Sequence, residues 1–541
     1  MAQDLARREG MNADARAGID RLRQQAQGTD ASSLIDRLDD GTADESDWSA
    51  AGEILLRSDP ALAAALLDVA VQHFPATASM HYLFGNALRM SARYGEAESA
   101  LRTAIALAPA HANASISLAH LLREQGRMCA LAEIMLALWA NEPRTLDSDR
   151  RTLSFLCECE RYVEAGSLTG AMLEAHPHDA FLLRRAGEIA LILGRFDEAQ
   201  RHLRASLAID ANQASAWLRL AHTHRFIERN DDDLGRLDAA AARTDLDPDV
   251  QASIGFARGK AFDDLGLIAE AVDVLKPANA GWHRAHPWDH EVWQRFVDER
   301  TRASILARAD PLDETVPVFI VGLPRSGTTL VESLLARDAQ VRSRGELNWV
   351  AALARQLGAN PSAPMLAAAG KFLLAQLRQD DAPARCIIDK NPLNFRHLDL
   401  IGAMLPQARI VHCRRDLRDT ALSLWSQHFA HEDLAWSYDF GDIEAYASGY
   451  RQLMAHWSQV LPVAIHPLDY EALVANPEDA IGELRIFLGL DLQTPSITRS
   501  AGSAIATASV WQARQKVHSK SVGRWRQYGP YLPDLEVLRP R

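Results

Sequence analysis

The sequence lacks long apolar runs and is poor in cysteine. Nowhere do 18 apolar residues follow one another without a charge, so we expect no membrane span. The first residues are polar and mixed in charge, with no apolar core behind them, which argues against a signal peptide. Five cysteines in 541 residues are too few for a disulfide framework. We therefore expect a soluble, cytoplasmic protein with reduced thiols.

An excess of positive charge is also missing. The net charge is −13, and residues 316–541 carry 24 basic and 22 acidic side chains, so the acidic excess lies in the first 315 residues. An acidic front half argues against nucleic acid as the main partner. No set of Asp and His residues is clustered in the sequence as a metal site would require, and we expect no metal.

A period of 34 residues runs through the front half from about residue 60. In one copy Gly85 and Ala97 are the small residues where paired helices cross, Tyr94 fills the turn, and Pro109 ends the second helix. The pattern resembles the tetratricopeptide family over roughly residues 60–280, which implies an all-α solenoid of stacked helix pairs. Its concave face would bind a peptide or a partner protein. Equally open is a scaffold or dimerisation arm without a ligand, so a homodimer remains an alternative.

These observations predict four parts of the chain. Residues 1–50 form a leader of uncertain order, residues 51–280 the tetratricopeptide solenoid, residues 281–316 a connecting segment, and residues 317–541 a second domain. We expect the three tryptophans near the connection, Trp282, Trp288 and Trp293, to pack between the domains.

A glycine-rich turn opens the second domain. The apolar run Val318 to Val321 predicts a buried strand, and the apolar spacing from Thr328 onward predicts a helix. Between them, Gly322 and Gly327 let the backbone bend so that N–H groups and the positive end of the helix dipole point at one spot. That spot suits a phosphate.

The loop departs from the loop of nucleoside-triphosphate enzymes in one residue type. The lysine that such a loop needs just after its second glycine is replaced by Thr328, and the cation stands inside the loop as Arg325. This change argues against a nucleotide-dependent kinase-like enzyme, which stays the alternative. A guanidinium is a two-pronged partner for an oxyanion.

The arrangement resembles the 5′-phosphosulfate loop of sulfotransferases that use 3′-phosphoadenosine 5′-phosphosulfate (PAPS), and more closely the branch of tyrosylprotein sulfotransferases. The resemblance implies an α/β P-loop-like domain with a central parallel sheet. It implies PAPS as the donor substrate and a hydroxyl on a compound or a protein as the acceptor, with protein tyrosine as the first candidate. Because a sulfuryl group carries less negative charge than a phosphoryl group, fixed Arg and Lys side chains can replace magnesium.

The resemblance also implies roles for residues after the loop. Glu346 would be the general base that removes the hydroxyl proton. Lys390, at the end of a strand, would stabilise charge on the leaving phosphate, unless it only pairs with Asp389. The implied catalytic residues are Glu346, Lys390 and Arg325. The implied donor-binding residues are Pro324, Arg325, Ser326, Gly327, Thr328, Thr329, Arg415, Ser423, Tyr470, Ser509 and Arg524.

Three of these assignments carry conditions. Arg415 and Ser423 are eight positions apart in a strand–turn–helix segment, so both can face the 3′-phosphate. Arg524 stands where the family has lysine, which leaves its geometry open. His412 is a second candidate for the general base, but its position in an apolar strand favours a histidine that packs in the core. A tetratricopeptide adaptor with an inactive domain is the remaining alternative, and the joint presence of the cations and Glu346 argues against it.

Overall fold

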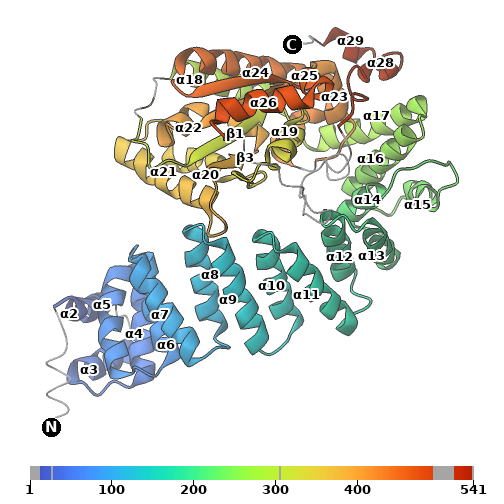
Figure 1. Ribbon diagram of the computed structural model, residues 1–541. Coiled ribbons are helices and arrows are strands. Elements are labelled where there is room, and N and C mark those ends of the chain that lie inside the picture. The colour runs from blue at the N-terminus through green and yellow to red at the C-terminus, as the bar shows by residue number, and fades with distance from the viewer. Residues whose placement is uncertain are drawn as a thin grey trace. The chain divides into compact units, whose positions relative to one another are not determined.

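The computed structural model describes residues 13–25, 29–303, 306, 308–429, 431–491 and 517–538 (Figure 1). Contacts divide the chain into two compact units. One comprises Met1–Arg161 with Gln379–Asp381, and the other comprises Tyr162–Arg378 with Ala382–Arg541. The predicted domain limits at residues 50, 280 and 316 stay predictions.

The first unit is built of helices in its described residues. Two of them, α2 and α3, belong to the segment that we expected to be of uncertain order, and they bury Ile19 and Leu38 in the same core as Leu66. The helices are α2 (Ala13–Gln25), α3 (Thr29–Asp40), α4 (Glu45–Ser58), α5 (Pro60–His73), α6 (Ala78–Met90), α7 (Tyr94–Leu107), α8 (Ala112–Glu124), α9 (Met128–Asn141) and α10 (Leu146–Glu158).

The 34-residue period is visible in the helix starts. The first helices of successive pairs, α6, α8, α10, α12, α14 and α16, begin at residues 78, 112, 146, 180, 214 and 248. Gly85 explains why a small residue recurs, because a Cβ there would lie 2.6 Å from Cγ of Leu101 on the paired helix. Gly187 meets Leu203 at the same distance. Close helix crossing therefore favours glycine in these two copies, and the predicted all-α solenoid is confirmed.

The second unit begins with the remaining helix pairs. They are α11 (Tyr162–Ala175), α12 (Ala180–Ile192), α13 (Phe196–Ile209), α14 (Ala214–Ala221), α15 (Asp232–Ala241), α16 (Pro248–Asp264), α17 (Ile268–Ala285) and α18 (His290–Arg302). The pair α14–α15 is irregular: α14 has only 8 residues, and residues 222–231 are not helical. Phe226 of this stretch is fully buried, beneath the ammonium of Lys260.

A five-stranded parallel sheet follows, in the order β2-β3-β1-β4-β5. The strands are β1 (Val316–Gly322), β2 (Val341–Ser343), β3 (Cys386–Asp389), β4 (Arg409–Arg414) and β5 (Ala464–Asp469). Alternate residues of β1 enter different cores: Phe319 and Val321 belong to one, Val318 and Ile320 to the other. Apolar layers therefore cover both faces of the sheet, as in doubly wound α/β domains, and the predicted fold class is confirmed.

Helices and turns connect the strands and follow the last of them, β5 (Figure 1). They are α19 (Thr328–Leu335), α20 (Trp349–Leu357), α21 (Ala363–Arg378), η1 (Pro392–His397), α22 (Leu398–Met404), α23 (Leu417–Trp425), η2 (Glu432–Tyr438), α24 (Phe440–Val460), α25 (Tyr470–Ala475), α26 (Pro477–Leu488), α28 (Trp525–Tyr528) and α29 (Asp534–Val537). Among the helices of the described ranges, none combines the length and apolar character needed to cross a membrane.

Within the second unit, α17 and α18 pack directly on the sheet domain. Trp293 is buried and stacks on Tyr446 of α24, with 4.3 Å between ring centroids. Asn279 donates a hydrogen bond to the carbonyl of Trp425 at 3.0 Å, and His283 pairs with Asp442 at 2.9 Å. Trp282 lies in the same core as Trp293. These two tryptophans pack between the helical and sheet elements, as their sequence context predicted.

Candidate active site

The loop between β1 and α19 lies at the carboxyl end of the central strand, where the chain order of the sheet reverses. Open α/β sheets bind ligands at this point. Gly322 has φ of +154°, and a Cβ there would lie 2.4 Å from the carbonyl oxygen of Cys413. Gly327 has φ of +99°, and its Cβ would lie 2.4 Å from the ring of Tyr470. Arg325 adopts φ of +72° without being glycine, so the loop is held in a strained conformation typical of functional sites.

Two polar atoms of this region have no hydrogen-bond partner among the described residues. They are Oγ of Ser326, in the loop, and Nε of Arg415, just after β4, and both are buried. In the next helix, no side chain of the described residues caps the N-terminus of α19. Buried polar groups are nearly always paired. Unpaired donors beside a helix N-terminus therefore fit an oxyanion that binds from outside the chain.

Arg415 connects three parts of the site. Its Nη1 donates to the carbonyl of Arg325 at 3.0 Å, and its Nη2 donates to the carbonyl of Ser521 at 2.7 Å. Its guanidinium lies over the ring of Tyr470, 4.6 Å from the centroid. The Tyr470 hydroxyl contacts Oγ of Ser521 at 2.6 Å. The structure thus brings Arg415, Tyr470, Ser521 and the loop together; their roles toward a donor stay predictions.

The cations of the site lie close enough to influence one another. Nε of Arg325 donates to Oγ of Ser423 at 2.9 Å. Burial, followed by the charge of Arg415, lowers the pKa of Arg325 to about 10, and Arg524 acts in the same direction. Arg325 therefore remains charged near neutral pH. A concentration of guanidinium charge in a buried loop favours a ligand with several negative charges.

A second group forms around Lys390, directly after β3. Lys390 is fully buried, and its ammonium donates to Oε1 of Glu346, whose side chain is 51% exposed. Glu332 of α19 lies 3.8 Å from the same ammonium and accepts a hydrogen bond from Ser343. Lys390 thus pairs with Glu346 and Glu332, not with Asp389. The half-exposed carboxylate of Glu346 can contact a substrate. Its contact with the buried ammonium of Lys390 holds it in position.

Asp389 holds the segment that carries Glu346. Its carboxylate accepts hydrogen bonds from Nδ2 of Asn394 at 3.0 Å and from the backbone N–H of Leu347 at 3.3 Å. Burial raises the pKa of Asp389 to about 7. Asp389 is therefore a support for the Glu346 segment, below the surface of the site.

His412 does not face this site. Its Nε2 lies 2.5 Å from the hydroxyl of Tyr450, and burial lowers the pKa of His412 to about 4. The preference for a core histidine over a catalytic base agrees with this placement.

The C-terminal segment contacts the site from Ser521 onward. Asp419 of α23 accepts hydrogen bonds from the backbone N–H groups of Gly523, at 2.6 Å, and Trp525, at 2.9 Å. Arg524 pairs with Asp263 of α16. Ser509, which the sequence placed at the donor phosphates, lies outside the described residues.

Comparison with known proteins identifies the region that contains this geometry. The sequence model of the sulfotransferase family matches residues 317–494. The recognition of a sulfotransferase domain in this part of the chain is therefore confirmed. The match spans β1 to β5 and includes Arg325, Glu346, Lys390 and Arg415.

Relatives cover different shares of the chain. An uncharacterized protein of Aquifex aeolicus (strain VF5) is 27% identical over 71% of this chain and 53% of its own length. A protein-tyrosine sulfotransferase of Drosophila melanogaster is 25% identical over 36% of this chain and 41% of its own length. The alignments thus span about half, or less, of these relatives. The solved sulfotransferase domain of the Synechococcus PCC 7002 olefin synthase is 18% identical over 42% of this chain and 91% of that domain, with a TM-score of 0.31.

The candidate site contains residues that sequence reasoning missed. Glu332 is a buried acid among the apolar residues Val331, Leu334 and Leu335 of α19, and this was the available signal. Ser521 lies three residues before Arg524, which the sequence analysis named. Asp263 is separated from its partner Arg524 by more than 250 residues, so no local pattern connects them.

Pro324 and Ser326 are buried in the loop, and Thr328 and Thr329 form the first turn of α19.

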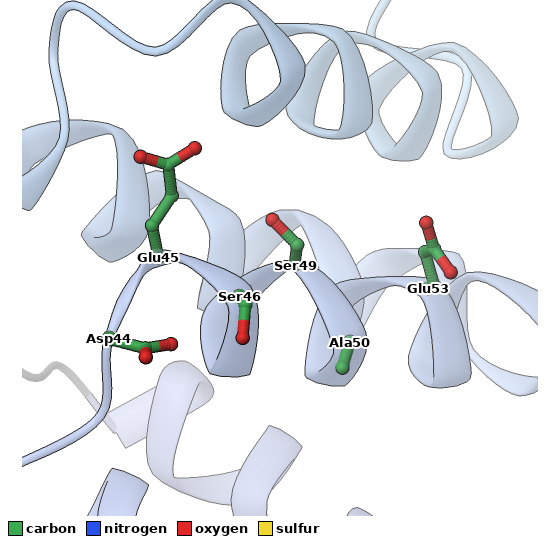
Figure 2. A pocket seen from close by; sticks show the side chains of 6 residues that line it. All are labelled: Asp44, Glu45, Ser46, Ser49, Ala50 and Glu53. Atoms are coloured by element: carbon green, nitrogen blue, oxygen red, sulfur yellow. The ribbon is translucent and has the colours of Figure 1, made fainter.

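A separate hollow of about 580 Å³ lies along α4 in the first unit and is lined by Asp44, Glu45, Ser46, Ser49, Ala50 and Glu53. Figure 2 shows Glu45, Ser49 and Glu53 projecting from the same side of the helix. Its acidic lining would repel a phosphate or sulfate group. This hollow is therefore no candidate for the donor.

One group in the described ranges has the side chains of a metal site: His224, Asp231 and Asp233 lie within 4.8 Å of one another. Asp233 already accepts hydrogen bonds from Arg204 at 2.7 Å and Gln200 at 2.8 Å. These contacts explain the group as an ion-pair and hydrogen-bond cluster around the buried Asp233. The expectation that the enzyme needs no metal stays a prediction.

Proposed function

We propose that residues 317–541 transfer a sulfuryl group from PAPS to a hydroxyl of an acceptor. The observation that supports this most is the joint placement, at the carboxyl end of β1, of two arginines, the unpaired hydroxyl of Ser326 and the Lys390–Glu346 pair. The family match of residues 317–494 supports sulfuryl transfer in general. The donor and the acceptor are parts of the proposal.

The loop residues would hold the 5′-phosphosulfate. Ser326 Oγ, the first turn of α19 and the guanidinium of Arg325 supply donors around one point. Charge-assisted hydrogen bonds of this kind contribute about 1.5–3 kcal/mol each. Arg415, whose buried Nε lacks a protein partner among the described residues, would hold the 3′-phosphate together with Ser423. Tyr470 would support Arg415 through its ring.

Glu346 would accept the proton of the attacking hydroxyl. Its exposed carboxylate can reach an acceptor, and its contact with Lys390 keeps it in place. The role of Lys390 toward the leaving phosphate requires one exchange of contacts, because its ammonium is fully buried against the two carboxylates. When the hydroxyl proton arrives on Glu346, that carboxylate loses its charge and binds the ammonium less strongly. Lys390 is then free to donate to the phosphate oxygen as charge develops there.

The acceptor is proposed as a hydroxyl compound or a protein, with tyrosine as the first candidate because the Drosophila melanogaster relative is a protein-tyrosine sulfotransferase. The helix pairs would present or tether a macromolecular acceptor on a concave face. No magnesium is required in this proposal, because fixed guanidinium and ammonium groups neutralise the donor.

The test is product analysis with labelled donor. The protein is incubated with PAPS and with tyrosine peptides, simple phenols and sugars in separate reactions, and each acceptor is examined by mass spectrometry. We expect one acceptor class to gain a sulfuryl group and the Arg325→Ala variant to lose that product. Label that moves to an acceptor equally well with Arg325→Ala would contradict the assigned site.

A further inference from the structure

The C-terminal segment from Lys520 to Tyr528 is held at three places, and one of them is on the solenoid. Arg415 and Tyr470, from the donor site, contact Ser521. Asp419 of α23 accepts the backbone N–H groups of Gly523 and Trp525. The third contact comes from α16, a helix of the last tetratricopeptide pair.

Asp263 of α16 makes that third contact with two side chains. Its Oδ1 accepts hydrogen bonds from Nη2 of Arg524 and from the hydroxyl of Tyr528. The side chains of Arg524 and Asp263 are 31% and 25% exposed, so the pair is partly shielded from water. The Tyr528 side chain is fully buried in the core of the sheet domain. A single solenoid carboxylate therefore fixes both ends of α28.

The neighbouring Asp264 has a different task. It forms an ion pair with Lys260 at 2.6 Å and accepts the backbone N–H of Phe226 at 3.1 Å, and both contacts stay within the solenoid. Asp263 is thus the acidic residue at the end of α16 that points to the sheet domain.

Arg524 follows Ser521 by three residues, and Ser521 is contacted by Tyr470 and by Arg415, which itself donates to the loop carbonyl of Arg325. In agreement with this placement, the charge of Arg524 contributes to the lowered pKa of Arg325. The charges of Arg415 and Arg524 both disfavour the charged form of Arg325, so without an anion the three guanidinium groups repel one another.

We propose that Asp263 is a positioning residue for the donor site: the solenoid carboxylate holds Arg524 beside the loop, ready to contact a donor phosphate. This inference rests on the proposed function, since it takes the donor to be PAPS. A guanidinium has five N–H donors in a fixed plane. The contact with Asp263 uses one of them, and the others can reach a phosphate.

The same contact supplies negative charge where three cations meet. It also restricts the Arg524 side chain before the donor binds, so that less conformational entropy is lost on binding. The solenoid thus contributes directly to the proposed donor site. Without α16, the segment that carries Arg524 loses its contacts with Asp263.

The experiment measures binding of adenosine 3′,5′-bisphosphate, the product of the donor, by calorimetry with the full chain. Removing the charge in Asp263→Asn should weaken binding about three- to tenfold, the effect of freeing one long side chain. The matched control is Asp238→Asn, which breaks a similar partly exposed pair with Arg258 at 2.8 Å between α15 and α16. We expect the control to bind within about twofold of the wild type.

A double-mutant cycle separates positioning from a general loss of structure. In an Arg524→Gln background, Asp263→Asn should have no further effect on binding, because the group that it positions is already gone. Asp263→Glu should restore most of the affinity. The inference is overturned if Asp263→Asn binds as tightly as Asp238→Asn, or if its loss persists in full in the Arg524→Gln background. A wild-type chain that does not bind the bisphosphate would overturn the proposed donor, and this inference with it.

Discussion

The Glu346–Lys390 pair gives the sharpest prediction about catalysis. Glu346→Gln keeps the shape of the side chain but cannot accept a proton, so turnover should fall by about 10²–10⁴. That loss corresponds to roughly 3–5 kcal/mol in the barrier. Affinity for adenosine 3′,5′-bisphosphate should change little, because Glu346 is not among the residues assigned to the donor.

The structure also indicates how much Glu346→Gln lowers the stability of the folded protein. Glu346→Gln leaves the buried Lys390 with Glu332 at 3.8 Å as its remaining carboxylate neighbour among the described residues. Because the Glu346 side chain is 51% exposed, water screens the lost pair, and we expect a stability loss of only about 1 kcal/mol. This loss is too small to explain the expected fall in turnover.

Glu332→Gln is the matched control, since it removes the other carboxylate near the same ammonium without touching the proposed base. The assay is single-turnover transfer from PAPS to the acceptor identified by product analysis, with thermal unfolding of each variant in parallel. We expect Glu332→Gln to reduce turnover far less than Glu346→Gln. A Glu346→Gln enzyme that keeps more than about a tenth of wild-type turnover, or a Glu332→Gln enzyme equally slow, would refute Glu346 as the base.

Three further predictions concern the donor, the pH and the first unit. Arg415→Ala should weaken adenosine 3′,5′-bisphosphate by about 1.5–3 kcal/mol and affect adenosine 5′-monophosphate much less, as calorimetry can show; equal losses would move Arg415 away from the 3′-phosphate. Because burial raises the pKa of Asp389 to about 7, the native state binds more protons than the unfolded chain between about pH 4 and 7, and stability falls as pH rises through that window. The Asp389→Asn variant lacks this dependence on pH. Denaturant titrations should therefore show that the variant gains stability relative to the wild type from pH 5 to pH 8. A difference in the free energy of unfolding that stays constant over this range would contradict the raised pKa. A chain that starts at Tyr162, the first residue of the second unit, should bind the bisphosphate like the full chain, and a lost affinity would give the first unit a part in the donor site.

Much of the fold could be predicted because its determinants are local. Gly85, Ala119, Gly187 and Ala221 lie at multiples of the 34-residue period, and a small residue there lets neighbouring helices cross closely, so the sequence shows the repeat directly. Val318 to Val321 form a strand buried on both faces, so an unbroken apolar run identified it. Gly322 and Gly327 take positive φ values next to a carbonyl and a tyrosine ring, which no other residue tolerates without strain.

What could not be predicted depends on contacts between distant parts of the chain. The period implies a full helix after Ala214, yet α14 ends at Ala221 and the chain turns so that Phe226 is buried under Lys260. The pairing of Asp263 with Arg524 has no local signal, because each residue alone reads as a surface charge. Lys390 pairs with Glu346 and Glu332 and not with its neighbour Asp389, whose carboxylate is occupied by backbone and amide donors.

The central claim, that the β1–α19 loop and Arg415 together bind a nucleotide with both a 5′- and a 3′-phosphate, is tested most directly by one calorimetric comparison. Adenosine 3′,5′-bisphosphate, adenosine 5′-monophosphate and ATP with magnesium are titrated into the same preparation. We predict that the bisphosphate binds at least about tenfold more tightly than either of the others, since one charge-assisted phosphate contact contributes about 1.5–3 kcal/mol, and that added magnesium leaves its affinity unchanged. Tighter binding of ATP with magnesium than of the bisphosphate would contradict the account and favour a kinase-like enzyme.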